Sequence, residues 1–163
     1  MKNTVFFLLL ISFSSFSQEN LKQLLEKYNT ESVPYISVTD LQKEKNVVLL
    51  DAREPKEFEV SHLKNSICVG YDFFNIEKTL KKLPKNKNTK IIVYCSIGIR
   101  SEDIAEKLQK EGYTNVFNLY GGIFEWKNQN NTVVNNQNIP TEKIHTFNKE
   151  WSKWLHKGEK IYE

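Results

Sequence analysis

The strongest constraint on the fold is a pair of apolar, β-prone runs: VVLL at 47–50 and IIVY at 91–94. Neither run alternates polar with apolar residues, and such continuous runs are typical of strands that are covered on both faces of a parallel sheet. Shorter strand-like segments alternate with helix-like ones along the chain, and RSEDIAEKLQKEG, at 100–112, is the clearest of the latter. The sequence therefore predicts an α/β fold in which a parallel sheet is sandwiched between helices on both faces.

The amino-terminal residues follow a different pattern. Residues 1–17 combine a lone positive charge at Lys2 with an apolar run and small residues that end at Ser17, which is the pattern of a cleaved signal peptide. The apolar run is too short to span a bilayer comfortably, so we predict no stable membrane span. The mature protein is expected to be periplasmic or secreted, and its first residues, 18–32, to contain an amphipathic helix.

Residues 130–163 break the alternation of strands and helices. Their first part is rich in asparagine and predicts a linker with a small hairpin near Val133. The second part repeats apolar residues at helical spacing, which predicts a C-terminal amphipathic helix that packs back on the core. A helix face that binds a partner or a membrane surface is the alternative. The apolar residues are Ile144, Phe147, Trp151, Trp154 and Leu155.

Length and charge narrow the functional classes. The 163 residues suffice for one well-buried domain with a short extension. The net charge is only +3, and the basic residues are interspersed with acidic ones, so we predict no nucleic-acid partner. His145 and His156 have no neighbouring group of Cys, Asp or Glu residues, and we predict no metal and no other cofactor. The sequence leaves the oligomeric state open.

Cys95 follows the second apolar run directly and precedes a helix-like segment. Loops that leave the carboxyl ends of parallel strands build the binding sites of such sheets. Gly98 permits a positive φ, so that successive backbone amides of the loop can point at one anion, and Arg100 adds a fixed positive charge. These amides and the helix dipole would favour the thiolate form of Cys95, and the Arg100 guanidinium suits an anionic substrate. Ser101, or the Glu-Asp pair that follows it, is expected to cap the following helix.

Three segments in order, LLDAREPKEFEVSHL, CSIGIRS and GYTNVFNLYGGIFEW, resemble the rhodanese-like (sulfurtransferase) domain. The resemblance covers roughly residues 33–129. It rests on a Cys-x-x-Gly-x-Arg-Ser loop, on an Asp-x-Arg motif after the first apolar run, and on the Gly121-Gly122 pair with Trp126 behind it. The family implies the parallel-sheet fold that the strand pattern predicts.

The resemblance also implies a two-step sulfur transfer. The catalytic Cys95 would attack the sulfane sulfur of a small donor anion such as thiosulfate, or of a persulfide or polysulfide, and hold it as a persulfide. A thiol or cyanide acceptor would then remove the sulfur. The substrate-binding residues implied by the loop are Ser96, Ile97, Gly98, Ile99, Arg100 and Ser101.

Asp51 and Arg53 match the Asp-x-Arg motif of the family and are expected to support the site. We expect Arg53 to pair with Glu57 and Asp51 to lie nearer to the site. In the strand order of the family, the strand of Cys68 and the strand of Cys95 are separated by a third. We therefore expect two free thiols rather than a disulfide, with Cys68 as a small buried hydrophobic residue.

Two alternative functions follow from the same loop. Cysteine phosphatases of this architecture have five residues between Cys and Arg, whereas four separate Cys95 from Arg100. A phosphatase or arsenate-reductase-like activity is therefore a weaker hypothesis than sulfur transfer. A non-catalytic or thiol-redox module is the second alternative, although the chain has no Cys-x-x-Cys pair. Ile97 and Ile99 make the loop apolar, which favours weak thiosulfate turnover or a less charged donor.

Overall fold

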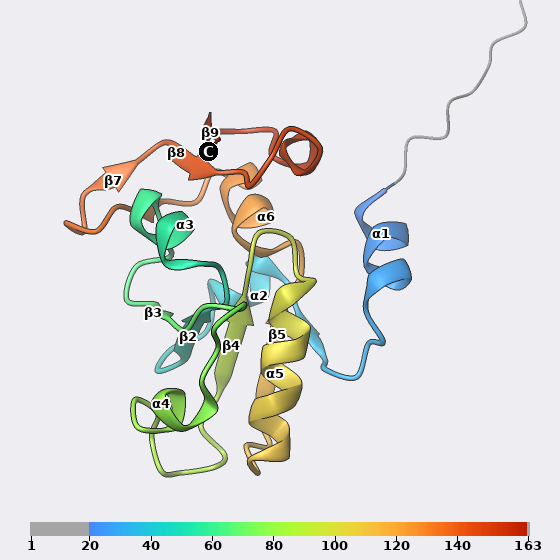
Figure 1. Cartoon of the computed structure of the whole chain (residues 1–163), viewed down its shortest axis with the longest axis vertical. Helices are drawn as coiled ribbons and strands as arrows, with labels where there is room; N and C mark the ends of the chain where they lie inside the picture. The colour runs from blue at the N-terminus through green and yellow to red at the C-terminus, as the bar shows by residue number, and fades with distance from the viewer. Residues whose placement is uncertain (1–19, 163) are drawn as a thin grey trace, which may run out of the picture.

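The structure, a computed structural model, describes residues 20–162, and the expected signal peptide lies outside the described residues. Its centre is a five-stranded sheet in the order β1-β5-β4-β2-β3, with every neighbouring pair parallel (Figure 1). The two apolar runs form the neighbouring strands β2 and β4, as predicted from their lack of alternation. The strands are β1 (Tyr35–Ile36), β2 (Val48–Asp51), β3 (Ile67–Cys68), β4 (Ile91–Tyr94) and β5 (Val116–Leu119).

Helices cover both faces of this sheet. Successive residues of β4 point to opposite faces: Ile92 packs in one apolar cluster with the first, second and sixth helices, and Val93 packs in the other with the fifth. The predicted α/β fold with helices on both faces is therefore confirmed. The helices are α1 (Leu21–Tyr28), α2 (Val38–Leu41), α3 (Pro55–Val60), α4 (Ile76–Leu80), α5 (Arg100–Lys110) and α6 (Gly122–Asn128).

The predicted C-terminal amphipathic helix is wrong. The hairpin near Val133 is present, with β6 (Val133–Val134) antiparallel to β7 (Pro140–Thr141). After it, β8 (Lys143–His145) and β9 (Glu159–Ile161) form a parallel pair, and only a short 3-10 helix, Trp151–Trp154, lies between them.

Backbone hydrogen bonding explains why no long helix forms. The backbone groups of β8 bond to β9 and are not available to a helical turn. Phe147 then has a φ of 65°, in the left-handed region, and the Asn148 side chain accepts the Trp151 N–H at 2.9 Å. Ile144 and Leu155 are nevertheless fully buried in the cluster around Ile92, so the segment does pack back on the core, as expected.

Within residues 20–162, no helix combines the length and the apolar character that crossing a membrane requires.

Candidate active site

Cys95 lies at the carboxyl end of β4, where the sheet turns into the loop 96–99 that precedes α5. Its side chain is buried, and its sulfur accepts the Gly98 N–H at 3.1 Å and faces the Ser101 hydroxyl at 3.5 Å. The positive φ predicted for Gly98 is present, at 108°, and the Gly98 amide points back toward the sulfur. The expected cap role of Ser101 is not what the structure shows: Ile99 occupies the N-cap position of α5, and Ser101 faces the sulfur.

Two asparagines fix the orientation of the Gly98 peptide. Asn29 Nδ2 and Asn118 Nδ2 each donate to the Gly98 carbonyl at 2.8 Å. In a trans peptide the C=O and the following N–H point in opposite directions, so this arrangement turns the Ile99 amide away from the asparagines. Asn118 also accepts the Ser101 hydroxyl at 2.7 Å. Neither asparagine was among the residues expected from the loop motif.

Arg100 is engaged by Glu57. Its Nη1 and Nη2 donate to the two carboxylate oxygens of Glu57 at 2.7 and 2.8 Å, and Nη2 also donates to Ser96 Oγ at 3.1 Å. Burial alone would raise the pKa of Glu57, but the hydrogen bonds and charge of Arg100 hold that pKa below its usual value. The expected pairing of Glu57 with Arg53 is therefore wrong.

Arg53 instead pairs with Asp51. The guanidinium donates to Asp51 through Nε at 3.0 Å and through Nη2 at 2.6 Å, and it also donates to the Ser61 carbonyl at 2.6 Å. Both side chains are fully buried, and neither lines the cavity beside Cys95. The Asp-x-Arg pair thus ties the segment after β2 to the end of α3, and α3 in turn presents Glu57 to Arg100.

A cavity of about 270 Å³ opens over Cys95. The loop contributes Ser96, Ile97, Ile99 and Arg100 to its wall, while Gly98 and Ser101 lie behind the sulfur. The remaining lining comes from distant segments that the loop motif does not indicate: Glu54, Tyr71, Asp72, Phe147 and Trp151.

Glu54 organises one wall of this cavity. Its carboxylate accepts the backbone N–H groups of Tyr71 and Asp72 at 3.1 and 2.8 Å. The Tyr71 hydroxyl bonds to Asp103, and this hydrogen bond, followed by burial and the Asp103 charge, raises the pKa of Tyr71 to about 12. Tyr71 therefore presents a neutral phenol to the site.

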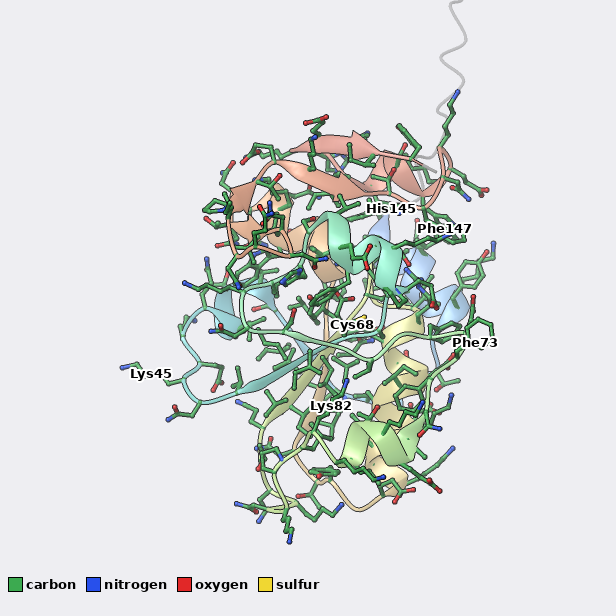
Figure 2. The ribbon with its side chains drawn as sticks, turned by 60° about the vertical axis from the view of Figure 1, so that its left-hand side comes forward. Lys45, Cys68, Phe73, Lys82, His145 and Phe147 are labelled. Carbon is green, nitrogen blue, oxygen red and sulfur yellow. The ribbon has the colours of Figure 1, made fainter. Side chains whose placement is uncertain are left out.

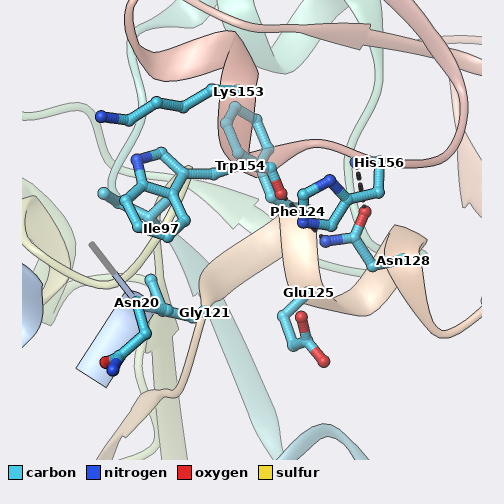
Figure 3. Close-up of a pocket in the computed structure, with 10 residues that line it drawn as sticks. Asn20, Ile97, Gly121, Phe124, Glu125, Asn128, Lys153, Trp154 and His156 are labelled. Atoms are coloured by element: carbon cyan, nitrogen blue, oxygen red, sulfur yellow. Dashed lines mark hydrogen bonds between the residues drawn. The ribbon is translucent and has the colours of Figure 1, made fainter. Parts of the chain in front are cut away.

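Figure 3 shows a second, larger hollow of about 380 Å³, and Ile97 is the one residue among 20–162 that lines both the Cys95 cavity and this hollow. It is bounded by α6 and by the 3-10 helix, and Asn128 Oδ1 there accepts the His156 N–H at 2.7 Å. Cys95 does not line it, so the chemistry of the thiol belongs to the smaller cavity.

Cys68 is a separate thiol. It is half-buried in β3 (Figure 2). Strand β2 lies between it and the strand of Cys95, and both cysteines are free. Its sulfur lies 3.8 Å from the Arg53 carbonyl oxygen, and burial together with the Asp51 charge raises the pKa of Cys68 to about 11. Cys68 therefore remains a thiol at neutral pH.

This shift predicts the pH dependence of Cys68 alkylation. Because only the thiolate reacts, the iodoacetamide rate of the Cys95→Ser protein should rise about tenfold per pH unit from pH 7 to 10, without a plateau below the pKa of about 11. Intact mass spectrometry at timed intervals measures that rate. A plateau near pH 8.5, the ordinary thiol value, would contradict it.

Gly122 brings α6 against the Cys95 loop. The Ile123 and Phe124 amides donate to the carbonyls of Cys95 and Ser96 at 2.9 and 3.1 Å. A Cβ at Gly122 would collide with the Cys95 carbonyl oxygen and lie only 2.7 Å from that of Ser96, and its φ is 54°. The close Gly121-Gly122 turn is thus required by backbone contact with the loop.

We expect Gly122→Ala to lower the free energy of unfolding by about 2–5 kcal/mol, since it adds a clash to left-handed strain. Gly112→Ala is the matched control, because Gly112 also has a positive φ, 88°, but has open space around it. It should cost only about 1–2 kcal/mol. Urea unfolding measures both, and equal losses would show that the backbone contact is unimportant.

Comparison with known proteins agrees with this geometry. Residues 36–129 match the family model described as a rhodanese-like domain, which is more than half of the chain. The chain therefore belongs to the rhodanese-like domain family. Phe147 and Trp151, which line the Cys95 cavity, lie outside the matched segment.

The similar proteins are named for two different activities. The chain is 27% identical to the thiosulfate sulfurtransferase GlpE of Coxiella burnetii, over 66% of this chain and 97% of that protein. It is 34% identical to a tRNA uridine(34) hydroxylase of Hamiltonella defensa, over 55% of this chain but only 26% of the hydroxylase. A rhodanese-related protein from Thermoplasma volcanium superposes with a TM-score of 0.54 at 29% identity, covering 62% of this chain and 97% of that one.

Proposed function

We propose that the protein is a sulfurtransferase that carries sulfane sulfur as a persulfide on Cys95. The observation that carries this proposal is the setting of the Cys95 sulfur, which faces the Gly98 amide and the Ser101 hydroxyl at the base of a cavity that also holds Arg100. The Gly98 N–H that bonds to the sulfur and the nearby Arg100 guanidinium favour an anionic sulfur, both as the attacking thiolate and as the persulfide.

The first half-reaction loads Cys95. Its thiolate attacks the outer sulfur of the donor and forms a new S–S bond, while the donor's own bond to that sulfur breaks. The leaving group departs with that electron pair, as sulfite from thiosulfate or as a thiolate from an organic persulfide. No external oxidant or reductant is consumed.

The second half-reaction removes the sulfur from the Cys95 persulfide. An acceptor thiolate or cyanide attacks the outer sulfur of the persulfide, and Cys95 leaves as a thiolate that is stabilised as before. Because the acceptor binds only after the first product has left, the kinetics should be of the ping-pong type.

Steady-state kinetics test this mechanism. With cyanide as acceptor, thiocyanate formation should give parallel double-reciprocal lines when donor and acceptor are varied. Intersecting lines, or no thiocyanate from a folded protein with either thiosulfate or an organic persulfide, would refute the proposal.

A phosphatase or arsenate-reductase-like activity fits the site less well than sulfur transfer. A phosphatase needs an arginine that can clamp a phosphoryl group, but the two Nη groups of Arg100 are bound to Glu57 and the loop is one residue shorter. Hydroxylation of tRNA is not proposed, because the match covers only 26% of the hydroxylase.

We also propose that the mature protein works outside the cytoplasm, on the basis of the signal-peptide pattern in residues 1–17. Amino-terminal sequencing of protein from an exporting host should find a start near Gln18. Recovery of the chain with its first residues intact would contradict this localisation.

A further inference from the structure

The C-terminal segment supplies an aromatic wall to the Cys95 cavity. Phe147 and Trp151 both line it, and the Arg100 guanidinium carbon lies 5.8 Å from the Phe147 ring centroid. Trp151 also makes an edge-to-face contact with Tyr28 of α1, at 6.3 Å between ring centroids. Because both wall residues lie beyond the segment that matches the family, this wall is an addition to the shared domain.

The backbone of Phe147 is strained. Its φ of 65° lies in the left-handed region, which is unfavourable for a bulky side chain. The strained backbone does not bury Phe147, which remains 44% exposed. Strained residues of this kind cluster at ligand-binding sites, where the surrounding structure imposes them.

Charge in the cavity argues against a doubly charged donor. Among residues 20–162, the charged side chains that line it are the carboxylates of Glu54 and Asp72 and the guanidinium of Arg100. Glu57 already binds Arg100 through both of its oxygens, so the cationic side chain has a permanent counter-ion. A dianion would therefore approach the Cys95 thiolate and two carboxylates, and within the described part of the chain the one cation that lines the cavity, Arg100, is already paired with Glu57.

We propose that Phe147 and Trp151 are specificity-determining residues for the donor, which is a singly charged sulfane-sulfur compound with an apolar substituent. This inference rests on the proposed function. The apolar group of a persulfide R–S–S⁻ packs against the two rings, and its outer sulfur reaches Cys95. Transfer then forms the Cys95 persulfide and releases R–S⁻ with the electron pair of the broken S–S bond.

Three donors with related chemistry separate charge from apolar contact. Thiosulfate is a dianion, methanethiosulfonate is a small monoanion, and benzenethiosulfonate is a monoanion with an aromatic ring. Each gives up its outer sulfur to a thiolate and leaves as sulfite or a sulfinate. In the wild type, kcat/KM should rise in that order, with benzenethiosulfonate at least about tenfold above methanethiosulfonate.

Two variants and one control locate the effect. Phe147→Ala should lower the ratio of kcat/KM for benzenethiosulfonate to that for methanethiosulfonate by roughly fivefold to tenfold, through loss of ring contact. Asp72→Asn should raise kcat/KM for thiosulfate relative to methanethiosulfonate by about threefold, through loss of repulsion. Phe73 is 93% exposed and does not line the cavity, so Phe73→Ala should change neither ratio (Figure 2).

The outcomes are distinguishable. If no donor loads Cys95 in the folded protein, the proposed sulfurtransferase function itself fails. If all three load Cys95 but the Phe147→Ala ratio equals that of the wild type, or thiosulfate is the best donor, the aromatic-wall inference is overturned while the sulfurtransferase function stands. The Asp72→Asn readout keeps the charge argument testable should Phe147→Ala unfold.

Discussion

Replacing Cys95 with serine is expected to lower sulfur-transfer turnover by at least about a thousandfold while leaving the fold intact. The hydroxyl is nearly isosteric with the thiol and can accept the same Gly98 N–H. A serine alkoxide, however, is not formed at neutral pH and cannot carry sulfur as a persulfide. Thiocyanate formation measures the activity, and circular dichroism with thermal unfolding measures the fold.

Cys68→Ser is the matched control for this substitution. Cys68 is the only other cysteine of the chain, and it lies outside the Cys95 cavity. Its replacement should leave turnover within about twofold of the wild type, because a non-contacting thiol adds nothing to the transition state. Retention of more than a tenth of the wild-type activity by Cys95→Ser would contradict the assignment of Cys95 as the sulfur carrier.

Replacing Glu57 with alanine is expected to lower the free energy of unfolding by about 3 kcal/mol and to disable the site. Glu57 is fully buried and binds both Nη groups of Arg100, and its carboxylate also accepts the Glu54 N–H at 2.9 Å, at the start of α3. Without it, a largely buried guanidinium loses its counter-ion beside Cys95. Turnover should fall together with stability.

Glu59→Ala tests whether the effect of Glu57 is specific, because Glu59 is an exposed glutamate on the same helix. It should change the free energy of unfolding by less than about 0.5 kcal/mol. Glu57→Gln is the second variant, because it keeps the shape of the side chain and removes only its charge. Urea unfolding that places Glu57→Ala and Glu59→Ala within error of each other would show that the Glu57–Arg100 pair does not support the site.

The sheet could be predicted because its signal is local. An apolar run without alternation, such as 91–94, is typical of a strand that is covered on both faces of a parallel sheet, and a cysteine at its end then lies where a site forms. The C-terminal helix was predicted wrongly because Ile144 and Leu155 do share one buried side, but through a strand and a 3-10 helix rather than through one helix. Periodicity alone does not separate these two arrangements.

The residue pairs that form ion pairs and contacts within the site could not be predicted in the same way. Arg53 lies four residues from Glu57 and two from Asp51, and local spacing permits either pair, whereas Arg100 reaches Glu57 from 43 positions away. Phe147 carries no local signal that would place it over Arg100. Such contacts depend on how the elements pack, and sequence spacing does not contain that information.

The central claim is that the Cys95 sulfur accepts and holds one sulfane sulfur atom. The intact mass of the mature protein after exposure to thiosulfate and, separately, to an organic persulfide tests it most directly. A gain of one sulfur atom with at least one donor, lost on addition of cyanide, absent in Cys95→Ser and retained in Cys68→Ser, is the result that we predict. No gain with either donor, in a folded protein whose Cys95 still alkylates, would contradict the claim.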